Sequence, residues 1–203
     1  MRVFLIRHGE SKDNLHKIIS GHRAVSLTSL GKKQAKNLGK KLRNRKILFD
    51  AVYSSDLQRA AETTAIICKM LQIKNCFFDK RLRERDAGIF TGRCSQSLTP
   101  EEVAFREMTL NDLDKKIPEG ESNREMLERV QEVFFEIIAQ HKENETILIV
   151  AHGGTLYHIL VRILKVLPEQ LDEWFGNCEP TVIEREKRSA PWKVTYFNDK
   201  KLL

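Results

Sequence analysis

Two histidines and two arginines follow three apolar stretches of the chain. Arg7 and His8 come after "VFLI", Arg59 lies shortly after "DAVYSS", and His152 comes directly after "TILIVA". A neutral imidazole is a nucleophile and a proton carrier, and a guanidinium presents a planar, permanently charged fork of donors. Together these side chains predict a pocket that binds an oxyanion.

The apolar stretches themselves indicate how such a pocket could be assembled. Continuous runs such as 147–150 are typical of strands that are covered on both faces, which predicts a mainly parallel sheet in a three-layer α/β/α fold. Ligands of such sheets bind beyond the carboxyl ends of the strands, where the following helices present free backbone N–H groups. We therefore expect the two histidines and two arginines to meet at one edge of the sheet.

Other segments fit the same layered plan. Ser122 and Glu125 form a capping box before an apolar helical stripe that runs to Ile138, and Asp56 is the predicted N-cap of a helix over 57–71. Pro100–Met108 is predicted to be a short helix. After Pro180, the segments "TVIEREKR" and "PWKVTYF" are predicted to be two strands of a terminal hairpin.

Length and composition favour one domain. The chain has 203 residues, of which 41% are hydrophobic and 31% charged, and these values are ordinary for a globular protein. We expect residues 1–203 to form a single domain, with a small lid insertion at about 93–121, where the apolar pattern weakens.

The net charge of +7 raises the question of an anionic partner. The densest basic stretch, Lys32–Lys46, surrounds apolar residues at helical spacing and contains no aromatic residue, so we interpret it as the solvated face of a helix. We expect no nucleic-acid partner, although a basic nucleic-acid-binding module with incidental histidines remains the alternative from another functional class.

Cysteine content and hydropathy favour a soluble, cytoplasmic protein. The four cysteines form no C-x-x-C pair, and none precedes an arginine at the spacing of a cysteine phosphatase: Cys68, Cys76, Cys94 and Cys178. Val3–Ile6 is too short for a signal peptide, and the longest uncharged stretch, Thr146–Val161, is too short for a membrane span. We expect no membrane partner.

Each candidate residue also has a structural interpretation. A lone histidine after a strand is more often a hydrogen-bonded core residue, and a lone arginine in a first helical turn is more often on the surface. A metal site is not expected, because His8 and Glu10 have no third ligand nearby. It is the coincidence of these residues at three strand ends that favours a functional site.

These residues belong to a longer ordered set of motifs that resembles the histidine phosphatase superfamily, the phosphoglycerate mutase-like enzymes. The match runs from residue 1 to about residue 160 and comprises Arg7-His8-Gly9-Glu10 with Asn14, Leu27-Thr28 with Gly31 and Ala35, Ser54-Ser55-Asp56 with Arg59, Ala60 and Thr63, "RLRERDAGIFTG" at Arg81–Gly92, Gly120-Glu121-Ser122 with Arg129, and Ala151-His152-Gly153-Gly154.

The resemblance implies a role for each site residue. His8 is the expected nucleophile and Glu84 the proton donor, whereas spacing alone would equally allow Glu84 to pair with a neighbouring arginine. The groups expected to hold the phosphoryl group or contact the substrate are Arg7, Asn14, Arg59, His152, Ser20, Gly21, His22 and Gly153. Glu10 is expected to orient Arg7 or His8.

The function that the resemblance implies is a metal-independent phosphatase without a cofactor. It would hydrolyse small phosphorylated metabolites through a phosphohistidine on His8. Phosphoglycerate mutase, which uses the same intermediate, is the alternative, but the short 93–121 segment favours access of water. Ser20, His22 and Ala87 depart from the common family pattern, so the substrate stays open, as does a homodimer. Three basic residues near the expected entrance are predicted to bind a second anionic group: Arg23, Arg93 and Arg106.

Overall fold

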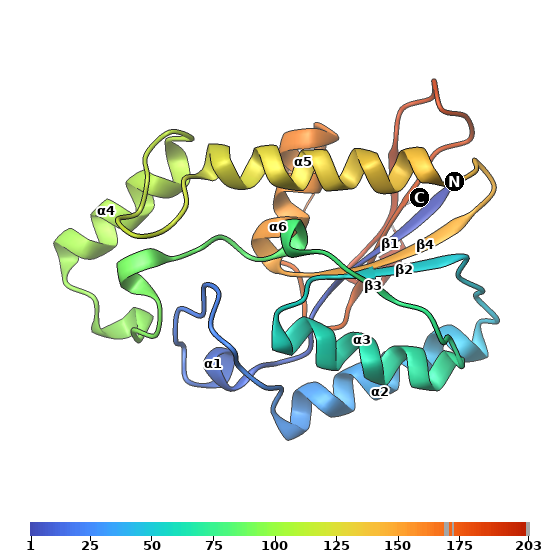
Figure 1. Cartoon of the computed structure of the whole chain (residues 1–203), viewed down its shortest axis with the longest axis horizontal. Coiled ribbons are helices and arrows are strands. Elements are labelled where there is room, and N and C mark those ends of the chain that lie inside the picture. The colour runs from blue at the N-terminus through green and yellow to red at the C-terminus, as the bar shows by residue number, and fades with distance from the viewer. Residues whose placement is uncertain (169–170, 172, 202–203) are drawn as a thin grey trace.

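Strand β1 (Arg2–Arg7) lies in the middle of a seven-stranded sheet with the order β3-β2-β4-β1-β5-β6-β7 (Figure 1). The computed structural model describes residues 1–168, 171 and 173–201. The other strands are β2 (Ala51–Ser54), β3 (Phe77–Phe78), β4 (Thr146–Ala151), β5 (Pro180–Glu184), β6 (Lys193–Phe197) and β7 (Lys200–Lys201).

The register of the parallel strands brings three chain segments to one edge. β1 pairs with β4 so that Arg7 lies opposite Ala151, and β2 pairs with β4 so that Ser54 lies opposite Val150. The backbone N–H of His8 donates to the carbonyl of Ala151 at 3.0 Å. His8 and His152 therefore leave the sheet side by side, as the strand pattern predicted.

The sheet is mixed. Its β3-β2-β4-β1 half is parallel, whereas β5, β6 and β7 run antiparallel beyond β1. The two strands predicted after Pro180 are β5 and β6, and their ladder shifts register between Val182 and Ile183. The expected α/β architecture is confirmed, and the parallel half carries the predicted site.

Helices cover both faces of the sheet. α2 (Ser29–Asn44) and α3 (Gln58–Leu71) lie on one face, and α5 (Asn123–Gln140) lies on the other with α6 (Gly153–Tyr157), as Figure 1 shows. Residues 3–6 of β1 are all buried, and they alternate between the two cores. This is the pattern of a strand covered on both faces.

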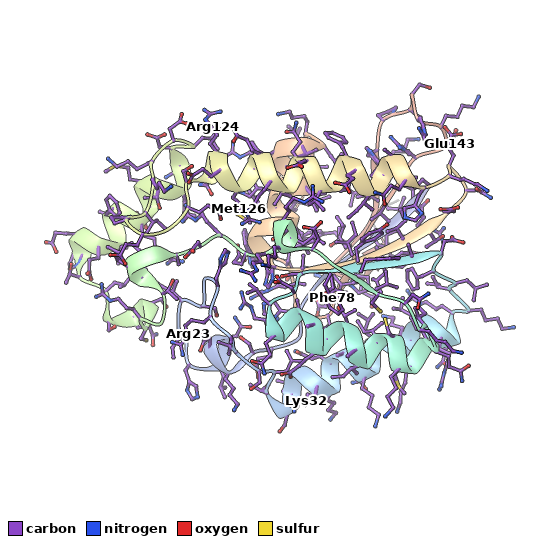
Figure 2. The ribbon with its side chains drawn as sticks, viewed as in Figure 1. Arg23, Lys32, Phe78, Arg124, Met126 and Glu143 are labelled. Carbon is purple, nitrogen blue, oxygen red and sulfur yellow. The ribbon has the colours of Figure 1, made fainter. Side chains whose placement is uncertain are left out.

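The basic helix α2 behaves as predicted. Its buried residues, which include Leu38 and Leu42, face the sheet, whereas most of its lysines are exposed. Figure 2 shows Lys32 on the outer side of α2 and Met126 on the inner side of α5. No helix in the described part of the chain is both long and apolar enough to cross a membrane.

Two helix starts differ in their capping. Ser122 and Glu125 form the predicted capping box of α5. The prediction for Asp56 was wrong: α3 has Leu57 as its N-cap, and both oxygens of the Asp56 carboxylate accept hydrogen bonds from Arg83 instead. An arginine that is distant in sequence but adjacent in space offers two charged donors, which a helix N-terminus does not.

The segment 93–121 lies beyond the carboxyl ends of the parallel strands, opposite the two termini (Figure 1). It contains the 3-10 turn η3 (Ser95–Ser97) and α4 (Pro100–Asn111), which extends past the predicted Met108. A small apolar cluster of Ala87, Phe90 and Ile117 packs beneath it with Phe105. The short elements on the rim are α1 (Lys12–Leu15), η1 (Lys80–Leu82) and η2 (Gly88–Phe90), and a π-helical turn, η4 (His158–Ile163), follows α6.

Candidate active site

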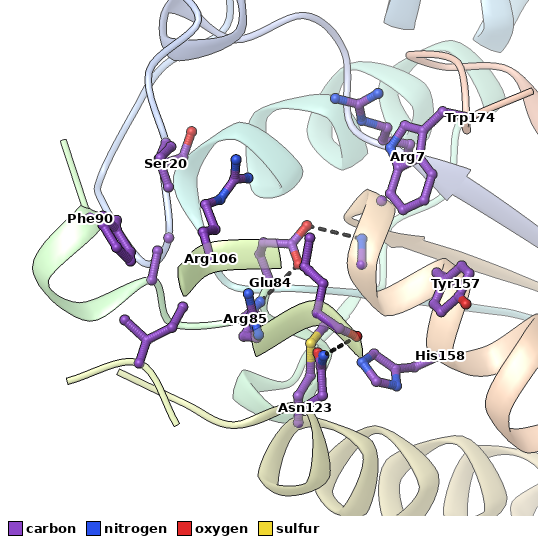
Figure 3. Close-up of a pocket in the computed structure, with 18 of the residues that line it drawn as sticks. Arg7, Ser20, Glu84, Arg85, Phe90, Arg106, Asn123, Tyr157, His158 and Trp174 are labelled. Atoms are coloured by element: carbon purple, nitrogen blue, oxygen red, sulfur yellow. Dashed lines mark hydrogen bonds between the residues drawn. The ribbon is translucent and has the colours of Figure 1, made fainter. Parts of the chain in front are cut away.

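A cavity of about 480 Å³ opens at the edge of the sheet where β1 and β4 end. Most of the predicted site residues line it: Arg7, His8, Asn14, Ser20, Gly21, Arg59, Glu84 and Gly153. His22 and His152 are not among its lining residues. Figure 3 shows this cavity with Glu84 near its centre.

His8 is buried, with only 4% of its surface exposed, and its two ring nitrogens have different partners. Nδ1 lies 2.7 Å from the carbonyl oxygen of Gly9, and Nε2 lies 3.2 Å from Nε of Arg59. Because a carbonyl only accepts and a guanidinium only donates, Nδ1 carries the proton and Nε2 carries the lone pair. Burial lowers the pKa of His8 well below its ordinary value, and Arg59 and Arg7 lower it further. The ring is therefore neutral at neutral pH, with Nε2 as its nucleophilic atom.

Two guanidinium groups are positioned beside this imidazole. Arg59 is 1% exposed, and its two terminal nitrogens donate to the carbonyls of Gly21 and Arg23. Nη1 of Arg7 donates to the carbonyl of Phe175 at 2.7 Å. Burial lowers the pKa of Arg59 to about 10, so it stays charged at neutral pH. The structure thus excludes the alternative of Arg59 as a surface residue.

His152 packs against His8, with 5.2 Å between the ring centroids, and is fully buried. Its Nε2 lies 2.8 Å from the hydroxyl of Ser55, and its Nδ1 has no partner. Burial, followed by the charge of Arg59, lowers its pKa well below the ordinary value. In this structure His152 is therefore neutral and its ring packs against that of His8. It is not among the lining residues of the cavity, and its contact with the phosphoryl group stays a prediction.

The carboxylate of Glu84 is held by backbone groups. Oε1 accepts from the N–H of Arg85 at 2.8 Å, and Oε2 accepts from the N–H of Gly154 at 3.1 Å (Figure 3). A Cβ at Gly154 would lie 2.2 Å from Oε1, so a side chain there would displace the Glu84 carboxylate. The alternative of an ion pair does not hold: the neighbouring guanidinium groups of Arg81, Arg83 and Arg85 bind Asp79, Asp56 and Thr109 instead.

Comparison with known proteins identifies the family. Residues 3–200 match the family model of the histidine phosphatase superfamily (branch 1). The chain belongs to this superfamily. It is 34% identical over 197 residues to a probable phosphoglycerate mutase GpmB of Yersinia enterocolitica, which covers 95% of this chain and 87% of that protein.

Solved structures of superfamily members share the fold. The α-ribazole phosphatase of Shigella flexneri is 29% identical, with a TM-score of 0.80 over 98% of this chain and 96% of that one. A mycobacterial glucosyl-3-phosphoglycerate phosphatase is 24% identical, with a TM-score of 0.81 over 97% and 98% of the two chains. The second likeness concerns the fold alone.

Three further predicted residues of this superfamily member form one wall of the cavity. The Asn14 side-chain oxygen accepts from the N–H and hydroxyl of Ser11, so its amide N–H₂ is left for a ligand. Ser20 and Gly21 line the cavity from a turn in which Gly21 has a φ of +47°, a conformation that favours glycine. The Gly21 carbonyl accepts from Arg59, which fixes the turn to the site.

Two expectations need correction. His22 does not line the cavity: its Nε2 lies 2.7 Å from the carbonyl of Glu84 and its Nδ1 lies 3.5 Å from Asp86, so it supports the segment that carries Glu84. Glu10 orients neither Arg7 nor His8, because its carboxylate accepts from the hydroxyl of Thr28. Both side chains bind polar groups from segments that are distant in the sequence, and local sequence patterns do not identify such partners.

Of the three basic residues predicted to lie near the entrance, only one lines the cavity. Arg93 forms two hydrogen bonds with Glu102, and Arg23 lies 3.7 Å from Asp13, so neither lines the cavity. Only Arg106 does. The superfamily member has further lining residues that sequence reasoning missed: Arg85, Asn123, Tyr157, His158, Arg162 and Trp174. The signal for His158 and Arg162 was their spacing, because His158 comes four residues after Gly154 and Arg162 comes four residues after His158.

In the described residues, no group of three or more His, Cys, Asp or Glu side chains could hold a metal ion. Arg7 and Arg59, which lie beside His8, can neutralise the charge of a phosphoryl group that is bound there.

Proposed function

We propose that the protein is a phosphomonoesterase that hydrolyses small phosphorylated metabolites through a phosphohistidine on His8. The observation that carries this proposal is the differential hydrogen bonding of one buried imidazole. Nδ1 is tied to the Gly9 carbonyl, which leaves the Nε2 lone pair beside Arg59 in a cavity that also holds the Glu84 carboxyl.

In the first step, Nε2 of His8 attacks phosphorus and forms an N–P bond while the ester P–O bond breaks. The charges of Arg7 and Arg59 stabilise the equatorial phosphoryl oxygens, and phosphoryl transfer needs little more than such alignment and charge stabilisation. Glu84, in its protonated form, donates its proton to the departing oxygen. The negative charge of the bound phosphate favours that protonated form.

In the second step, water replaces the alcohol. The Glu84 carboxylate accepts a proton from the water as its oxygen attacks phosphorus, and the N–P bond breaks to release inorganic phosphate and neutral His8. The two backbone hydrogen bonds from Arg85 and Gly154 keep the carboxyl in one position for both steps.

Phosphoglycerate mutase is the second candidate, because the curated relative is named as one. The two activities differ in the fate of the phosphohistidine, which a mutase returns to a bound product and a phosphatase gives to water. Incubation with 3-phosphoglycerate and a panel of other phosphometabolites separates them. We expect phosphate release to exceed isomerisation for every substrate, and faster isomerisation of 3-phosphoglycerate would favour the mutase.

His8→Ala tests the proposal itself. The variant should lose turnover and the acid-labile phosphate that the unmodified protein acquires on His8, because alanine offers no nucleophile. Turnover by the unmodified protein should persist in excess chelator. Salt-sensitive binding to oligonucleotides without any phosphohistidine would instead favour a nucleic-acid-binding module.

A further inference from the structure

The cavity holds more positive charge than one phosphoryl group requires. Among the described residues, five arginines line it, namely Arg7, Arg59, Arg85, Arg106 and Arg162, together with a single carboxylate, that of Glu84. Arg7 and Arg59 lie beside His8. The other three lie in the part of the wall formed by the Glu84 segment, α4 and the turn η4. In the view of Figure 3, Arg85 and His158 lie on the side of Glu84 away from Arg7.

These three arginines differ in how their charge is used. Arg85 donates to the carbonyl and hydroxyl of Thr109, so it has a structural partner. Among the described residues, the guanidinium groups of Arg106 and Arg162 form no hydrogen bond or ion pair, and Arg162 has only the ring of Tyr157, 5.9 Å away. Two cations of the cavity lining are therefore left for a ligand.

The cations also act on one another, which shows that they form a cluster. Burial lowers the pKa of Arg85 most and Arg106 lowers it further, and burial lowers the pKa of His158 most, with further lowering by Arg162 and Arg85. Glu84 raises the pKa of Arg85, and the carboxylate of Glu121 is already held by two hydrogen bonds from Arg129. Like charges in a partly buried wall repel one another unless an anion lies between them.

Two buried nitrogen atoms in this wall have no partner. They are Nδ1 of His158, whose side chain lines the cavity although the residue is only 3% exposed, and Nε of Arg162. Buried donors and acceptors in folded proteins are nearly always hydrogen-bonded, so an unpartnered pair beside a cavity needs an explanation. Among the described residues no hydrogen bond holds either side chain, so both are available to a bound oxyanion.

We propose that Arg106, Arg162 and His158 bind a second anionic group, so that the substrate is a phosphomonoester whose alcohol part carries a carboxylate or a further phosphate. This inference rests on the proposed function, because it places the first phosphoryl group at His8. The lining of the same cavity includes apolar side chains that suit a hydrocarbon or sugar spacer: Ala87, Phe90, Leu110, Ile117 and Met126.

A matched series of alkyl phosphates tests the inference. The members have increasing chain lengths and end in a carboxamide, a carboxylate or a phosphate, so that the leaving alcohol changes little while the terminal charge changes. At the chain length that fits, we expect kcat/KM to be at least about tenfold higher for an anionic end than for the amide, mainly through KM. The anionic end that gives the larger ratio identifies the group.

Variants assign the preference to residues. In Arg162→Gln and, separately, in the less buried Arg106→Gln, the ratio between anionic and amide substrates should fall to within about threefold of unity. The ratio is measured within each variant, so a general loss of activity cancels. Arg43→Gln, which removes an exposed charge on α2, is the matched control and should keep both the ratio and the activity of the unmodified protein.

The outcomes separate the two proposals. Equal kcat/KM for amide and anionic esters at every length, with phosphohistidine still formed on His8, would overturn the inference and leave the proposed function standing. A full anion preference in both Arg106→Gln and Arg162→Gln would overturn the assignment to these residues. No phosphate release from any ester and no acid-labile phosphate on His8 would instead defeat the proposed function.

Discussion

At the scale of single residues, the reactivity of the site depends on what each polar atom touches. The Gly9 carbonyl selects the tautomer of His8, and Arg59 then meets the remaining lone pair. Glu84 accepts hydrogen bonds from two backbone N–H groups and forms no ion pair among the described residues, whereas Glu10, two residues from His8, accepts from the hydroxyl of Thr28. Two carboxylates close to the same strand end thus have different capacities for catalysis.

Glu84→Gln should separate substrates by their leaving groups. The amide cannot donate the proton that an alkoxide needs, so we expect kcat for alkyl phosphates to fall by about 10²–10⁴-fold, and by less than about tenfold for 4-nitrophenyl phosphate. Steady-state rates on both substrates give the comparison. The glutamine side chain has one accepting oxygen, so it can keep only one of the hydrogen bonds that Glu84 accepts from Arg85 and Gly154.

Glu10→Gln is the matched control for this substitution. It removes a neighbouring carboxylate that accepts only from Thr28, and we expect it to change neither rate by more than about twofold. Equal losses on alkyl and nitrophenyl substrates in Glu84→Gln would contradict the role of Glu84 as the acid.

At the scale of elements, the end of α4 is fastened to the catalytic segment through one residue. Thr109 is fully buried, its carbonyl accepts from Arg85 and Asn123, and its hydroxyl lies 3.3 Å from Nη2 of Arg85. Arg85 follows Glu84 directly, and Asn123 begins α5. The 93–121 segment is thus connected to the proton donor and to the core helix at the same point.

Thr109→Val should loosen this connection, because valine has nearly the same shape as threonine but lacks the hydroxyl. The substitution removes the hydroxyl but keeps the backbone carbonyl, and the loss of a buried hydrogen-bond partner costs about 1–3 kcal/mol. We expect faster amide hydrogen exchange in α4 and a KM raised by up to about tenfold, with a smaller change in kcat. Thr109→Ser, which retains the hydroxyl, should restore both, and unchanged exchange in the valine variant would contradict the connection.

The contact between α2 and the loop after β1 has no room for a side chain. A Cβ on Gly31 would lie 2.1 Å from the carbonyl oxygen of Glu10, and one on Gly9 would lie 2.5 Å from that of Gly31. Both obstacles are backbone atoms, which cannot rotate away. This close approach is the reason for the glycine directly after His8.

Gly31→Ala should therefore destabilise the protein. Overpacking of this kind costs about 1–3 kcal/mol of the free energy of unfolding, and we expect kcat/KM to fall as well because the strain reaches the loop behind His8. Urea unfolding measures the first effect. Lys40→Ala, on the exposed face of the same helix, should stay within about 0.5 kcal/mol of the unmodified protein.

At the scale of the whole molecule, three buried histidines couple stability to pH. Burial is the largest cause that lowers the pKa of His8, His152 and His158, the last to about 4. In the unfolded chain each would titrate near its ordinary value of about 6.5. Below that pH the unfolded state binds protons that the native state does not bind, so the native state is stabilised above about pH 6.5 and loses that stabilisation as the pH falls.

Urea unfolding between about pH 7.5 and pH 5 should show this dependence. Each buried histidine contributes up to about 1.4 kcal/mol per pH unit below 6.5 to the loss of unfolding free energy. His158→Gln should reduce the slope by one such contribution, whereas His16→Gln, at an exposed position, should leave it unchanged. A free energy of unfolding that stays constant over this range would contradict the burial of neutral rings.

The amino-acid sequence by itself determined the layers of the fold and the reacting edge. Uninterrupted apolar runs predicted the central strands, and the Ser122–Glu125 capping box predicted the start of α5. These signals act over a few residues, where backbone geometry and side-chain spacing are closely coupled. The juxtaposition of Arg7, His8 and Arg59 followed from the rule that parallel strands end together.

Only the tertiary structure decided which polar groups are free to act. Asp56 binds Arg83 although the local sequence predicted it as an N-cap, and His22 supports the Glu84 backbone although the resemblance placed it at the pocket entrance. The partner of a charged side chain is chosen among groups that folding brings together from distant segments, and desolvation makes that choice decisive for its charge and reactivity. Sequence patterns extend over only a few residues and therefore do not contain this information.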